Sequence, residues 1–98
     1  MLELNEDNFK EETKAGLVLL DFYSEACGPC RMLAPILNQL IGIKVAKVDI
    51  YDNIETTMKF KVSAVPTLVF LKDGVEVERA TGVRSGEYLQ ERVDALNK

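Results

Sequence analysis

The 98-residue chain contains no tryptophan and no histidine, and only two of its residues are cysteines. A structural zinc site needs four ligands, and one cysteine pair without histidine does not supply them within a single chain. We therefore expect no metal site, and we expect no cofactor.

Long apolar runs are also missing. The longest ones, around residues 17–20 and 68–71, are far shorter than the roughly 20 residues that cross a bilayer. Residues 1–10 lack the basic stretch and apolar segment of a signal peptide. We expect no membrane partner and a cytoplasmic location, where disulfides tend to be transient and catalytic.

Basic residues are fewer than acidic ones: the chain has 12 Lys and Arg residues and 16 Asp and Glu residues, which gives a net charge of −4. Nucleic acids and anionic membranes are usually bound through a basic patch, so neither is expected as a partner. With 47% hydrophobic residues the chain can bury a core, and its length suits one domain over residues 1–98. We expect this domain to be a monomer.

Hydrophobic patterning predicts an α/β domain. The predicted strand at 17–23 is apolar on both faces except at Asp21, which is typical of a central strand covered by helices on both sides. A strand–helix–strand order up to residue 50 predicts parallel pairing with a right-handed crossover. The Asp73-Gly74 pair between two later strands predicts an antiparallel hairpin. In all, strands are predicted at 17–23, 43–50, 66–72 and 75–80, and helices at 9–14, 31–41, 53–60 and after Ser85.

Helix ends are predicted from capping residues. Asn5 or Asp7 can cap the first helix, and Gly16 ends it. Ser85 can cap the last helix. The apolar stripe of that helix is expected to contain Tyr88, Leu89, Val93 and Leu96.

Both cysteines lie in one motif, Cys27-Gly28-Pro29-Cys30, between the 17–23 strand and the following helix. Residues three apart in the first turn of a helix can come close enough for a disulfide. The unpaired amides and the positive dipole end at a helix N-terminus favour a thiolate. A Cys-x-x-Cys pair in this position predicts a dithiol that cycles with a disulfide. A purely structural bridge is the alternative, but so small a ring stabilises by only about 2 kcal/mol in the chain-entropy model.

Further segments accompany this motif along the chain: Leu19-Leu-Asp-Phe-Tyr, Arg31-Met, Ala34-Pro-Ile-Leu, Val45-Ala-Lys-Val-Asp, Val65-Pro-Thr-Leu-Val-Phe, Lys72-Asp-Gly and Gly82. Together with the cysteine motif, they make the chain resemble the thioredoxin family over essentially its whole length. The resemblance implies a three-layer sandwich with a mixed central sheet of four to five strands and about four flanking helices. It also implies reduction of protein disulfides, with disulfide-containing proteins as substrates and a thioredoxin reductase that recharges the dithiol.

The resemblance assigns roles to four residues. Cys27 matches the exposed nucleophile, and Cys30 matches the buried thiol that resolves the mixed disulfide. Asp21 matches a buried carboxylate that accepts the Cys30 proton, and Lys47 matches a partly buried lysine that tunes this carboxylate. On the residues alone two alternatives stay open: a solvated strand end for Asp21, and a water-facing side chain for Lys47.

A substrate-binding rim around Cys27 is also implied. Thioredoxins carry a cis-proline at the position of Pro66, and the backbone of Val65 can pair there with an extended substrate segment. Simpler interpretations are a strand start for Pro66 and an ordinary loop glycine for Gly82. The residues expected in the rim are Ala26, Gly28, Pro29, Val65, Pro66, Gly82 and Val83.

The chain departs from the family pattern at Ala26, where thioredoxins nearly always carry tryptophan, and in the short helix and loop after Cys30. These changes leave the dithiol chemistry intact and affect partner recognition, unless Ala26 is a neutral replacement.

Two other functions are a non-catalytic binding subunit on the same scaffold and an oxidase or isomerase. The first is disfavoured because a scaffold needs no proton acceptor such as Asp21. The second is disfavoured because Gly28-Pro29 is the dipeptide of reducing members.

Overall fold

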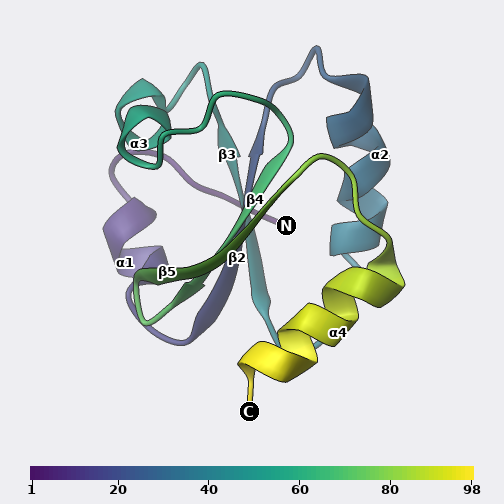
Figure 1. Cartoon of the computed structure of the whole chain (residues 1–98). Coiled ribbons are helices and arrows are strands. Elements are labelled where there is room, and N and C mark those ends of the chain that lie inside the picture. Colours follow the sequence, from purple (N-terminus) through teal and green to yellow (C-terminus); the bar gives the residue numbers. More distant parts are fainter.

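A mixed sheet of five strands, in the order β1-β3-β2-β4-β5, runs through the middle of the molecule (Figure 1). The computed structural model describes residues 1–98. The strands are β1 Leu2–Glu3, β2 Leu17–Tyr23, β3 Lys44–Asp49, β4 Thr67–Lys72 and β5 Val75–Thr81. The helices are α1 Phe9–Thr13, α2 Gly28–Leu37, α3 Ile54–Lys59 and α4 Gly86–Leu96. None of these helices has the length and apolar character that crossing a membrane requires.

The sheet confirms the pairings predicted from the sequence. β2 is central, with β3 parallel on one side and β4 antiparallel on the other. β4 and β5 form the expected hairpin, in which Lys72 pairs with Val75 across the Asp73-Gly74 turn. Both turn residues have positive φ, 50° and 85°, as the favoured two-residue hairpin turn requires.

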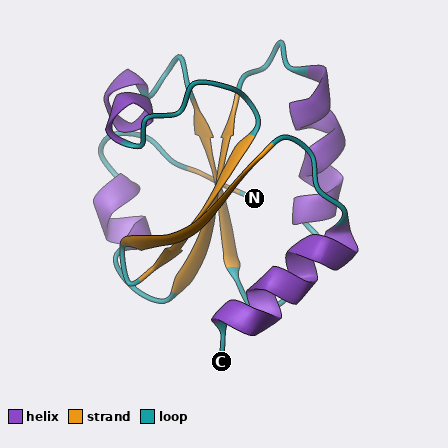
Figure 2. Cartoon of the chain, in the orientation of Figure 1, coloured by secondary structure: helices purple, strands orange, loops and turns teal.

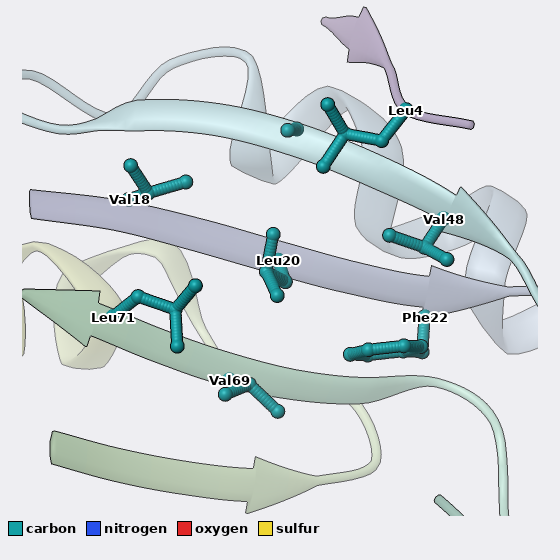
Figure 3. Close-up of a cluster of buried hydrophobic side chains, with 8 residues drawn as sticks. Leu4, Val18, Leu20, Phe22, Val48, Val69 and Leu71 are labelled. Atoms are coloured by element: carbon teal, nitrogen blue, oxygen red, sulfur yellow. The ribbon is translucent and has the colours of Figure 1, made fainter. Parts of the chain in front are cut away.

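Helices cover both faces of the sheet, with α1 and α3 on one side and α2 and α4 on the other (Figures 1 and 2). Side chains alternate along β2, so Val18, Leu20 and Phe22 enter the core on the α1 and α3 side, beside residues of β3 and β4 (Figure 3). Leu19 enters the core on the opposite face. There it packs with Leu33, Leu37, Leu68, Phe70, Leu89 and Val93. The fold is therefore the three-layer α/β sandwich that the resemblance implied.

Several predicted boundaries were wrong in detail. The sequence patterning missed β1, which has only two residues. Helix α1 starts at Phe9 as predicted and ends at Thr13, but its N-cap residue is Asn8 and not Asn5 or Asp7. The Asn5 side chain instead accepts the amides of Asp7 and Asn8, both at 2.8 Å, in the turn before the helix. Strand β4 begins one residue after Pro66.

The last helix begins as predicted, because the Ser85 hydroxyl accepts the Tyr88 amide at 3.1 Å. Its predicted stripe was partly wrong. Leu89 and Val93 are fully buried, but the Tyr88 side chain is 43% exposed. Tyr88 directly precedes Leu89, so the helical rotation places its side chain to one side of the face on which Leu89 and Val93 are buried.

Helix α2 ends at Leu37 and not near Ile41, and α4 fastens the short connection that follows it. Gln90 makes two hydrogen bonds to the Ile41 backbone: its Nε2 donates to the carbonyl at 2.8 Å, and its Oε1 accepts the amide at 2.9 Å. Asn97 donates to the Gly42 carbonyl at 2.8 Å. These three bonds attach the short connection between α2 and β3 to α4 and the residue that follows it.

Four chain segments meet at one edge of the sheet. Tyr23 at the end of β2 lies opposite Asp49 at the end of β3. Thr67 at the start of β4 lies opposite Phe22 on one side and Thr81 on the other. The segments after β2, β3 and β5 and the segment before β4 therefore emerge at this edge (Figure 1).

Candidate active site

The cysteine pair lies at this edge, where β2 is followed by α2. Cys27 is the N-cap residue of α2, and Cys30 is in its first turn. The two cysteines form a disulfide with their Cα atoms 5.2 Å apart, within the usual range for such a bond. The Cys27 amide donates to the Ser24 carbonyl at 3.2 Å, which shapes the turn that leads from β2 into the helix.

Cys27 lies at the positive end of the helix. Its Sγ accepts the Cys30 amide at 3.1 Å, as an N-cap side chain does. In the reduced protein, this amide and the helix dipole favour the thiolate of Cys27 over its thiol. Pro29 occupies the first turn, where its missing N–H leaves no hydrogen bond unmade.

The two cysteine residues differ in their access to solvent. Cys27 is half-buried, whereas Cys30 is only 4% exposed. An incoming disulfide can therefore approach Cys27 more readily than Cys30, which is the asymmetry the resemblance implied.

Asp21 is the buried carboxyl group of this region. It is 3% exposed, and its Oδ1 has no hydrogen-bond partner. It lines a cavity of about 470 Å³ together with Cys30 and Lys47. Desolvation by burial raises the pKa of Asp21 to about 7, although Lys47 lowers it and Glu3 raises it further. This burial rules out the alternative in which Asp21 is exposed to water at the end of its strand.

Lys47 is partly buried, with a side chain that is 37% exposed. Its ammonium pairs with Glu3 Oε1 at 3.4 Å and lies 5.3 Å from the centre of the Tyr23 ring. Lys47 is thus near Asp21, as expected, but it makes its ion pair with a residue of β1.

The expected rim residues occupy the segments that meet at the same edge. The Val65-Pro66 bond is cis, and the Pro66 carbonyl accepts the Gly82 amide at 2.8 Å. Gly82 has φ +90°, a conformation that favours glycine. Pro66 is buried, and Val65 and Gly28 are half-buried. The exposed members are Ala26, Pro29 and Val83.

Sequence reasoning missed three residues of this region. Glu3 belongs to the two-residue strand β1, which is too short to show a pattern, and Tyr23 donates its hydroxyl to both oxygens of Glu3 at 3.0 Å. Arg31 lines the cavity, and its Nη1 donates to the Glu25 carbonyl at 2.8 Å, which fastens the loop before the cysteines. The one sequence signal for Arg31 is its position directly after the cysteine motif.

Comparisons with known proteins agree with this geometry. The protein-family model described as Thioredoxin matches residues 1–95. Thioredoxin of Bacillus subtilis (strain 168) is 41% identical over 99 residues, covering 96% of this chain and 95% of that protein. Thioredoxin of Chlamydia pneumoniae is 41% identical over 90 residues, covering 88% of each.

Similarity extends to solved structures. A mutant thioredoxin from Halobacterium salinarum NRC-1 superposes with a TM-score of 0.91 at 30% identity, covering 99% of this chain and 90% of that one. The family match and the Cys27–Cys30 pair together show a thiol–disulfide oxidoreductase that reduces protein disulfides. The chain belongs to the thioredoxin family.

Proposed function

We propose that this chain reduces protein disulfides in two steps, with Cys27 as nucleophile, Cys30 as resolving thiol and Asp21 as proton acceptor. The observation that carries the proposal is the cavity that the buried residues Asp21 and Cys30 both line, next in the chain to a more exposed Cys27.

In the first step the Cys27 thiolate attacks one sulfur of the substrate disulfide. A bond between Cys27 and that sulfur forms, and the substrate bond breaks. The leaving substrate thiolate takes a proton from solvent. The product of this step is a mixed disulfide.

In the second step Cys30 must lose its proton before it can attack Cys27. The buried carboxylate of Asp21 accepts this proton, and its pKa of about 7 lets it both take up and release a proton near neutral pH. The Cys30 thiolate then attacks the Cys27 sulfur, so that the Cys27–Cys30 bond forms and the mixed-disulfide bond breaks. The substrate sulfur leaves as a thiolate and takes up a proton. The substrate has gained two electrons, and Cys27 and Cys30 are joined in the disulfide of the structure described above.

Substrate contacts are proposed at the rim residues. The exposed side chains of Ala26, Pro29 and Val83 and the backbone of Val65 beside Pro66 are accessible to an extended segment. The members that complete the rim are Gly28 and Gly82. We further propose a monomer of a single domain over residues 1–98 that works in the cytoplasm and is recharged by a thioredoxin reductase.

Catalytic reduction of insulin by dithiothreitol tests the proposal. Wild type should accelerate the reaction, and Cys27→Ser should abolish it without forming an adduct. With insulin alone, before dithiothreitol is added, Cys30→Ser should attack and then stall, so that a covalent adduct with insulin accumulates. Normal turnover by Cys30→Ser, or an adduct formed by Cys27→Ser, would reverse the two roles. Equilibration with glutathione measures the reduction potential, and a value near −270 mV, that of thioredoxin, is expected for a reductase.

A further inference from the structure

Three charged residues form a row across three neighbouring strands. Glu3 of β1 lies opposite Lys47 of β3, and Lys47 lies opposite Asp21 of β2. Adjacent strands are about 4.8 Å apart, so the lysine lies between two carboxyl groups on the same face of the sheet. It could pair with either of them.

The structure shows which of the two carboxyl groups forms an ion pair with Lys47. Its Nζ is 3.4 Å from Glu3 Oε1, while Asp21 Oδ1 has no partner. Tyr23 stabilises this ion pair in two ways: its hydroxyl donates to Glu3, and its ring lies under the Lys47 ammonium. Desolvation and the Glu3 hydrogen bond raise the pKa of Tyr23 above its usual range, so the hydroxyl stays protonated and remains a donor.

Few other charges reach Asp21. The remaining titratable and charged groups are on the cavity wall and at the end of β3: the amino group of Met1, Glu25, Cys30, Arg31 and Asp49. Arg31 is engaged with the Glu25 carbonyl. Lys47 is therefore the cation opposite Asp21 in the sheet, and its charge favours the carboxylate against the larger opposing effect of burial.

We propose that Glu3 is a positioning residue that holds Lys47 against Tyr23 and away from Asp21, which keeps the buried carboxyl group free to exchange a proton with Cys30. The inference rests on the proposed role of Asp21. If Lys47 instead paired with Asp21, the carboxylate would be stabilised and would be a weaker base for the Cys30 thiol.

The test is the titration of the Asp21 carboxyl carbon by NMR in oxidised protein labelled with ¹³C-aspartate, at low ionic strength because Glu3 is half exposed. In Glu3→Gln, Lys47 loses its carboxylate partner and can turn to Asp21, so the midpoint should fall by about one pH unit. Glu11→Gln is the matched control, since Glu11 also pairs with a lysine, Lys14, at 2.8 Å, but Lys14, unlike Lys47, does not line the cavity. It should leave the midpoint in place.

A double variant separates action through Lys47 from direct repulsion between the two carboxylates. In a Lys47→Met background, Glu3→Gln should lose most of its effect on the Asp21 midpoint. An unchanged midpoint in Glu3→Gln would overturn the proposal, and so would a shift that persists in full without Lys47.

The pH profile of insulin reduction is the second measurement, and its inflection should fall with the NMR midpoint in Glu3→Gln. Asp21→Asn should abolish this inflection. If it does not, the proton-acceptor role of Asp21 fails, while the NMR titration still decides whether Glu3 positions Lys47.

Discussion

Asp21 and Cys30 line one cavity from different elements, Asp21 from the central strand and Cys30 from the first turn of α2. Neither is accessible enough to meet a protein substrate, since they are 3% and 4% exposed. Their shared cavity suits proton transfer within the protein, and it gives Asp21 a measurable effect on stability as well as on rate.

Asp21→Asn should stabilise the oxidised protein at neutral pH and hardly change it near pH 4. The pKa of Asp21 is about 7 when folded and near 3.9 when unfolded, so the folded state holds a proton that the unfolded state has released between these values. Wild-type stability therefore falls as the pH rises from about 4 to about 7, by up to about 4 kcal/mol. Urea denaturation at pH 4.5 and pH 8 measures the free energy of unfolding of both proteins. An equal change with pH in wild type and Asp21→Asn would contradict the prediction.

The same substitution should slow disulfide reduction. Asparagine keeps the shape of the side chain but accepts no proton, and loss of a general base costs about 10²–10⁴-fold where that step limits the rate. Insulin reduction from pH 6 to pH 9 is the measurement. The deficit should shrink at high pH, because hydroxide can deprotonate Cys30 without Asp21.

Ala26→Trp should change which disulfides react. Ala26 is exposed beside Cys27, and an indole there would shield the thiolate and add an aromatic contact surface. We expect slower reaction with oxidised glutathione and better coupling to a thioredoxin reductase. Ala26→Leu separates bulk from aromatic character. If neither rate changes by more than about twofold in Ala26→Trp, the alanine is a neutral replacement.

Leu33→Ala and Met32→Ala should differ sharply in stability although the residues are adjacent in α2. Leu33 is fully buried in the core between the sheet and α4, so its truncation should cost about 2–5 kcal/mol. Met32 is 67% exposed, and its truncation should cost less than about 0.5 kcal/mol. Chemical denaturation of the oxidised proteins measures both, and equal losses would contradict the packing of α2 described above.

Local sequence patterns predicted the central part of this fold well. The apolar residues on both faces of the segment 17–23 identified β2 as a central strand, and the Asp73-Gly74 turn identified the hairpin, because both signals are local. β1 left no local signal, since it is a strand only through its pairing of Leu2 and Glu3 with β3. The end of α2 was misplaced because Gln39 and Leu40 continue it only with short-range bonds to Ile36 and Leu37.

The residues of the site also fall into those with a local sequence signal and those whose contacts depend on the fold. The cysteine pair could be found from four consecutive residues. The burial of Asp21 was implied by the resemblance and favoured by its apolar neighbours in β2. The partner of Lys47 could not be predicted, because Glu3 reaches it only through the sheet, and the choice between Glu3 and Asp21 depends on the Tyr23 hydroxyl.

Pairing on both sides of β2 also determines how internal motion is distributed in the molecule. Strands with two hydrogen-bonded neighbours and a fully buried apolar surface usually exchange their amide hydrogens only through global unfolding. The Ala26 amide, just beyond the end of this strand, lies in an exposed turn that can open locally. Residues 24–26 therefore separate Cys27 from the slowest-exchanging segment, so a partner can reshape this turn while Asp21 stays in place.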